Sequence, residues 1–104
     1  MATKEDVMQD YTRQLNDLGV SIDMDTLEMA FNACGPANYK EDSMYVAASD
    51  KEELERVYKN FVADELGIND EEKGMAMIHA VAEKMSSERM KYRAVFYYLL
   101  AKMK

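Results

Sequence analysis

The chain contains few residues that interrupt helices or crosslink chains. Its 104 residues include one proline, four glycines, one cysteine and no tryptophan. A single cysteine cannot form an internal disulfide, so nothing in the sequence requires an oxidising compartment. The scarcity of proline and glycine, together with the lack of sustained apolar–polar alternation, disfavours strands and favours helices.

Long apolar runs are also missing. No apolar stretch approaches the length of a membrane span, and the first residues, MATKEDVMQD, lack the basic and apolar regions of a signal peptide. We therefore expect a cytoplasmic protein with no membrane partner.

Cations are scarce over most of the chain. The net charge is −7, and residues 91–104 hold four cations and no acid, which leaves −11 on the first 90 residues. Such a body repels phosphate backbones over about a Debye length, ~8–10 Å at physiological salt. Nucleic acid is therefore disfavoured as a general partner, although the basic C-terminal segment alone could still contact an anion.

Recognisable catalytic and cofactor motifs are absent as well. No glycine-rich phosphate loop, nucleophile elbow or paired-cysteine motif occurs. The acids that begin at Asp23 do not fit a calcium loop, because a leucine, a glutamate and a cysteine occupy its fifth, sixth and twelfth positions. We expect no cofactor, no metal site and no catalytic residue.

Two lone side chains are candidates for chemical roles. His79 lies four residues before Glu83, so both could face one ligand from a helix, but a catalytic metal site requires three protein ligands. Cys34 falls near the C-terminal end of a helix, where the dipole disfavours a thiolate. We interpret His79 as a residue at the edge of the core and Cys34 as a buried, unreactive thiol.

Helical periodicity is what the sequence has in abundance, because apolar residues recur every three or four positions in five segments. Helix starts are predicted at Thr3, around Asp25, at Ser49 or Asp50, at Asn69 or Asp70, and at Glu88. Stops are predicted at Leu18-Gly19-Val20, Gly35-Pro36 and Leu66-Gly67-Ile68. The pattern predicts one all-α domain over residues 1–104, a compact bundle of about five helices with two antiparallel hairpins and a C-terminal core helix.

Two further features concern polar surfaces and loops. The acids at the helix starts are expected to form a solvated face; they are Glu52, Glu53, Asp70, Glu71 and Glu72. The one long connection, GPANYKEDSMYVAAS at 35–49, is too apolar for a free linker, so we expect it to lie against the core. Within it, Asn38 and Glu41 could cap a short helical turn.

Three stretches carry a family resemblance: GPANY at 35–39, NFVADELG at 60–67 and KYRAVFYYLL at 91–100. They resemble a small bacterial family, domain of unknown function 2853, and the likeness spans nearly the whole chain. The resemblance implies a compact all-helical domain. It carries over no catalytic or binding residue.

The C-terminal stretch KYRAVFYYLLAKMK presents a continuous apolar face when placed on a helix. A central packed helix is our first interpretation, and a binding role is the second. Adjacent Tyr97 and Tyr98 point about 100° apart, so both cannot easily share one core contact. We expect at least one of them to reach a second interface.

Three functional hypotheses remain open. The first is a non-catalytic protein-interaction or self-associating module, with a protein or a second copy of the chain as partner. Its interface residues are Tyr97, Tyr98, Arg93, Lys91 and Lys102, since tyrosine and arginine are favoured in interfaces. The second is a ligand-binding or enzymatic pocket between hairpins near His79, using Glu83 or Tyr45. The third is anionic-ligand or nucleic-acid binding through Arg93, Lys91, Lys102 and Lys104.

Overall fold

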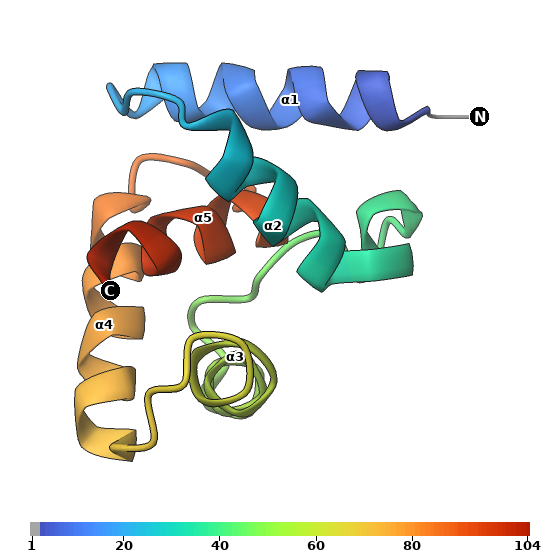
Figure 1. Cartoon of the computed structure of the whole chain (residues 1–104). Helices are drawn as coiled ribbons and strands as arrows, with labels where there is room; N and C mark the ends of the chain where they lie inside the picture. Colours follow the sequence, from blue (N-terminus) through green and yellow to red (C-terminus); the bar gives the residue numbers. More distant parts are fainter. Residues whose placement is uncertain (1–2) are drawn as a thin grey trace.

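A computed structural model describes residues 3–104, and within this range the chain forms five α-helices, a short 3₁₀ helix and a π-helical turn, with no strand (Figure 1). The all-α prediction is confirmed. No described helix is both long and apolar enough to cross a bilayer. The elements are α1 (Lys4–Asp17), α2 (Met24–Cys34), η1 (Gly35–Tyr39), α3 (Lys51–Val57), η2 (Tyr58–Ala63), α4 (Glu71–Lys84) and α5 (Arg93–Met103).

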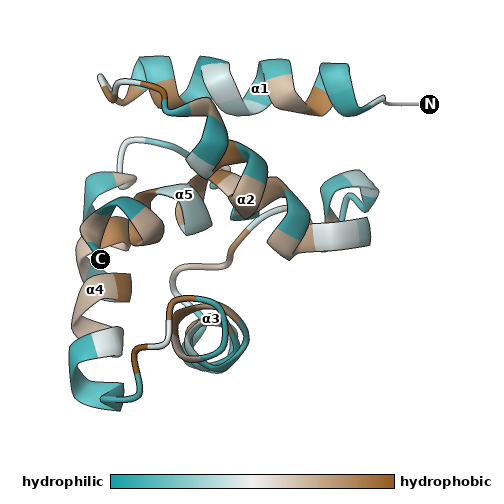
Figure 2. Ribbon diagram, viewed as in Figure 1, coloured by the Kyte–Doolittle hydropathy of each residue, from teal (hydrophilic) through white to brown (hydrophobic). Residues whose placement is uncertain are grey.

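Helix α5 lies at the centre of the molecule. Every residue from 94 to 100 is buried, because α2 packs closely along α5 while α1 and α4 contact it from other sides. Figure 2 shows the contrast between a largely apolar α5 and a largely polar α1. The helix has no polar side because neighbouring helices cover it, which confirms the core-helix interpretation.

The ends of α1 form as the sequence predicts. Thr3 and Asp6 make a reciprocal capping box at the start of the helix. At the other end, Gly19 adopts a φ of +72°. The N–H of Val20 donates to the carbonyl of Leu15 at 3.0 Å, which closes the helix and returns the chain to the core.

Helix α2 begins at Met24, close to the predicted start around Asp25, and its cap is Asp23, whose carboxylate accepts the N–H groups of Asp25 and Thr26. One predicted helix start is wrong, because α5 begins at Arg93 rather than at Glu88. The residues before it cannot continue a helix, because Tyr92 is extended, pairs with Tyr45 and donates its N–H to another element.

The predicted antiparallel hairpin is wrong for α3 and α4, which cross steeply. In Figure 1, α3 is seen along its axis while α4 lies across the view. The crossing is close at Gly74, where an added Cβ would fall 2.4 Å from a ring carbon of Tyr58. Tyr58 is also the residue at which the α-helical pattern of α3 widens into the π-turn η2.

The long connection lies against the core, as predicted. Val46 is buried, and its N–H donates to the carbonyl of Lys91 at 2.8 Å. Asn38 does not cap a turn with Glu41; its side chain is buried inside the turn formed by η1. The connection is therefore fixed to the segment that precedes α5.

Candidate functional site

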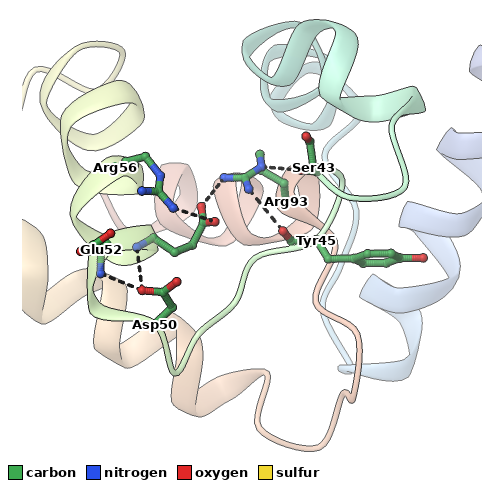
Figure 3. A network of polar contacts seen from close by, with 7 residues as sticks. Ser43, Tyr45, Asp50, Glu52, Arg56 and Arg93 are labelled. Atoms are coloured by element: carbon green, nitrogen blue, oxygen red, sulfur yellow. Dashed lines mark hydrogen bonds and ion pairs between the residues drawn. The ribbon is translucent and has the colours of Figure 1, made fainter.

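Arg93, the first residue of α5, holds three parts of the chain together (Figure 3). Its Nε donates to the carbonyl of Ser43 at 2.8 Å, and one terminal nitrogen donates to the carbonyl of Tyr45 at 3.2 Å. The other terminal nitrogen forms an ion pair with Glu53 of α3 at 3.0 Å. Arg93 therefore binds groups of its own chain, and its placement explains why a cation stands in an otherwise apolar helix.

Glu53 contradicts the prediction that the first-turn acids are all solvated. Its side chain is only 14% exposed; it accepts a hydrogen bond from Arg93 and forms an ion pair with Arg56 at 3.5 Å. Burial alone would lower the pKa of the Arg93 guanidinium, but hydrogen bonding to Glu53 and Tyr97 raises it. The Arg93 guanidinium therefore stays charged in spite of its burial.

A polar cavity of about 470 Å³ lies beside this network, and we call it the Arg93 cavity. It is formed where the end of α2, the long connection, α3, η2 and α5 meet. Its lining residues are Ala33, Cys34, Ala37, Asp42, Ser43, Glu53, Arg56, Asn60, Arg93 and Tyr97. Residues from GPANY, NFVADELG and KYRAVFYYLL all contribute, so three stretches far apart in the sequence converge on one hollow.

Tyr97 forms a rigid wall of the Arg93 cavity. It is 5% exposed and stacks on Phe61 with ring centroids 4.1 Å apart and planes inclined by 10°. Burial raises the pKa of its hydroxyl, and the nearby Arg93 guanidinium only partly offsets this. Burial likewise raises the pKa of the Cys34 thiol to about 12. Cys34 is therefore a neutral thiol at physiological pH, unsuited to nucleophilic attack.

These shifts give a pH dependence of stability. Burial raises the pKa of Cys34 and of Tyr11, Tyr92 and Tyr97 above the ordinary values of 9.0 and 10.0. Above those values the unfolded chain loses protons that the folded chain retains. The stabilisation is therefore complete below about pH 9 and falls as the pH rises, by up to about 1.4 kcal/mol per pH unit for each of Cys34, Tyr11 and Tyr97, and by less for the partly exposed Tyr92, whose charge water screens.

Urea unfolding across the alkaline range checks this expectation. Stability should begin to fall near the ordinary thiol pKa of 9.0. In Cys34→Ala the fall should begin nearer the ordinary tyrosine pKa of 10.0. If the free energy of unfolding of the wild-type protein stayed constant to one pH unit above the ordinary tyrosine pKa, the predicted pH dependence would be contradicted.

The prediction that at least one of the adjacent tyrosines points to a second interface is wrong, because both side chains are buried within the chain. Tyr98 is fully buried, and its hydroxyl donates to the carbonyl of Ser21 at 2.8 Å and accepts from the N–H of Asp23 at 2.9 Å. The tyrosines can share the core because different helices cover different sides of α5. The Tyr98 hydroxyl therefore binds the turn between α1 and α2 to helix α5.

The predicted cations do not form one site. Lys91 precedes α5 and donates to the carbonyl of Glu88 at 2.8 Å. Lys102, at the other end of α5, pairs with Asp23 at 3.3 Å and is 48% exposed. Arg93, at the start of α5, lies in the network described above. The structure brings none of these three side chains together.

His79 and Glu83 are both exposed on α4. His79 lines neither the Arg93 cavity nor the groove described next. Tyr45 lies in the long connection, with its ring 5.2 Å from that of Tyr92. Among residues 3–104, no group of three or more histidine, cysteine or acidic side chains is placed to hold a metal ion.

A second hollow of about 470 Å³ lies at the C-terminal end of α5, and we call it the α4–α5 groove. It is lined by the turn at 19–21, by Ala80, Val81 and Lys84 of α4, and by Leu99, Lys102 and Met103 of α5. Val81 and Leu99 are buried, whereas Met103 is 48% exposed. Lysines supply the only charges in a lining that is otherwise mainly apolar.

Several polar residues hold the fold together in ways that the sequence did not predict. Asn38 accepts from the Tyr11 hydroxyl at 2.7 Å, and its amide donates to the carbonyls of Phe31 and Gly35 at 2.8 Å. Gln14, also buried, donates to the carbonyl of Met90 at 2.7 Å. The burial of Gln14 could have been predicted, since it adjoins Leu15 on the apolar side of a helix. The burial of Glu53 could not, because its partner Arg93 lies 40 residues away in the sequence.

These observations define a small all-helical protein built around one buried C-terminal helix, with a hollow near each end of that helix. A family model described as "Protein of unknown function (DUF2853)" matches residues 10–104, so the chain belongs to this family. The resemblance seen in the sequence is confirmed. A comparison with curated proteins finds no match.

Proposed function

We propose that the chain is a non-catalytic, cytoplasmic interaction module that binds an acidic, amphipathic peptide segment of a protein partner in the α4–α5 groove. The observation that carries the proposal is the charge of the groove. Lys84 and Lys102 are its only charged lining residues, in a chain whose net charge is −7. Complementary charge would select an acidic partner and speed its encounter.

The shape and chemistry of the groove support a peptide as the occupant. A floor of Val81 and Leu99 with the flexible Met103 at the edge suits apolar anchor side chains, because methionine adapts to irregular partners. Its volume of about 470 Å³ lies within the usual range for binding pockets, about 300–1,000 Å³. Helical peptides present such anchors at positions i, i+3, i+4 and i+7, with charged residues beside them.

A selection from a library of displayed random peptides tests the proposal. Peptides retained by the wild-type protein should carry apolar anchors flanked by aspartate or glutamate. They should lose most of their binding to Ala80→Glu, which places a carboxylate in the groove, and to the double variant Lys84→Glu/Lys102→Glu. Ala76→Glu is the matched control, since Ala76 is exposed on the same helix outside the groove.

Several outcomes would reject the proposal. Selected peptides that bind Ala80→Glu as well as Ala76→Glu would place the interface elsewhere. Enrichment of basic peptides would contradict the charge argument. Sedimentation that shows a dimer of the wild-type protein, lost in Ala80→Glu, would assign the groove to a second copy of the chain. Saturable binding of a fatty-acid anion such as laurate, in the absence of peptide binding, would assign it to a small ligand.

A further inference from the structure

The Arg93 cavity has hydrogen-bonding capacity that the fold does not use. Of the five N–H groups of Arg93, the carbonyls of Ser43 and Tyr45, the carboxylate of Glu53 and the nearby Tyr97 hydroxyl engage four, which leaves one. Arg56 is 56% exposed and contacts Glu53 through one nitrogen only. The side chain of Asn60 is exposed at the same hollow. Donors are therefore available to a bound group, and the buried network already holds Arg93 in position.

The charges around the cavity are balanced. Arg56 and Arg93 supply two cations, and Glu53 and Asp42 supply two carboxylates. A lone anion would meet the two carboxylates, and a metal ion would meet the two guanidinium groups. A ligand that carries both charges can instead place each one beside its opposite.

We propose that the Arg93 cavity binds a small zwitterion, a free α-amino acid. Its carboxylate accepts from the guanidinium groups of Arg56 and Arg93, which suit the planar geometry of a carboxylate. Its ammonium group pairs with the exposed carboxylate of Asp42. Ala33 and Ala37 line the same cavity, and their small side chains leave room for the ligand's side chain.

The surroundings keep such a site in shape. Tyr97 is held by its stack on Phe61, and Arg93 is held by two backbone carbonyls and Glu53. A ligand therefore meets groups that are already ordered, which lowers the entropy cost of binding. This site is independent of the α4–α5 groove, with which it shares no lining residue.

A nuclear magnetic resonance titration with each standard amino acid at millimolar concentration tests the proposal. At least one should shift the backbone amides of Ala33, Ala37 and Asn60. Its amide derivative, which lacks the carboxylate, and its N-acetyl derivative, which lacks the ammonium group, should each bind at least about tenfold more weakly. A dipeptide, whose charges lie further apart, should also bind more weakly.

Two variants of exposed residues locate the binding without disturbing the core. Arg56→Gln and Asp42→Asn should each weaken binding about tenfold or more, while Arg13→Gln, a change to an exposed ion pair of α1, should not. Ala80→Glu should bind the amino acid normally, which separates this proposal from the groove proposal. No shift with any amino acid, equal binding of either derivative, or shifts confined to the groove would overturn it.

Discussion

Replacing Arg93 with alanine should lower the free energy of unfolding by about 3–5 kcal/mol, because it removes one member of a largely buried ion pair. The side chains of Arg93 and Glu53 are 15% and 14% exposed, so water can replace few of the hydrogen bonds that Glu53 loses. Glu53 would keep only Arg56, and the carbonyls of Ser43 and Tyr45 would lose their donor. Urea unfolding followed by far-ultraviolet circular dichroism measures the change.

Two further variants separate the network from general effects of charge. Arg93→Lys keeps the charge but cannot direct donors to three acceptors, so its stability should lie between those of wild type and alanine. Arg13→Ala removes an arginine that is 64% exposed and paired within its own helix, and should cost about 0–1 kcal/mol. Equal costs for Arg93→Ala and Arg13→Ala would show that the network adds nothing to stability.

The same variant should loosen the long connection before the helices. Besides the two side-chain contacts, the N–H of Arg93 donates to the carbonyl of Met44 at 2.7 Å. Without the Arg93 side chain, only this bond and the bond from the N–H of Val46 to the carbonyl of Lys91 would hold residues 44–46 against the start of α5. Hydrogen exchange should accelerate at residues 44–46 more than in α2, since local opening is easiest where few contacts remain.

The parts of the fold that the sequence predicts are those that depend on neighbouring residues. The capping box at Thr3 and the glycine stop at Gly19 are local arrangements, and both form as the spacing indicates. The burial of α5 follows from its composition, since a helix that is apolar almost all round needs cover on all sides.

The parts that the sequence does not predict depend on residues that meet only in the fold. Glu53 has the composition of an ordinary first-turn acid, and only its contact with Arg93, 40 residues away, makes it a structural group. The Arg93 cavity draws on five segments, and no single segment carries its pattern. The sequence pattern predicts that Tyr97 and Tyr98 cannot share one core contact and that at least one reaches a second interface, but the helices around α5 provide a separate buried contact for each.

The central position of α5 also determines where function can reside. Its middle is fully committed to packing, so neither Tyr97 nor Tyr98 presents its ring to solvent. The two hollows therefore lie near its ends, the Arg93 cavity at the start and the α4–α5 groove at the finish. Ligands at both ends would contact one rigid helix.

Asn38→Asp should be the second variant with a large effect, lowering the free energy of unfolding by about 2–5 kcal/mol at neutral pH. Asn38 is 1% exposed, and its amide donates to the carbonyls of Phe31 and Gly35. An aspartate would replace both donors with an oxygen that faces two carbonyl oxygens. The Tyr11 hydroxyl could still donate to the other oxygen, as it does in the wild type at 2.7 Å.

The pH dependence of this loss identifies its cause. Burial among acceptors would raise the pKa of the new carboxyl group in the folded state, so the variant would be least impaired at low pH and would lose stability as the pH rises. The gap between wild type and variant in urea unfolding should therefore widen from about pH 4 to about pH 7. Asn32→Asp, at an exposed position of the preceding helix α2, should show a small gap that does not widen in this way. If both variants lost the same stability at every pH, the hydrogen bonds of the Asn38 amide to Phe31 and Gly35 would not be what stabilises the turn at η1.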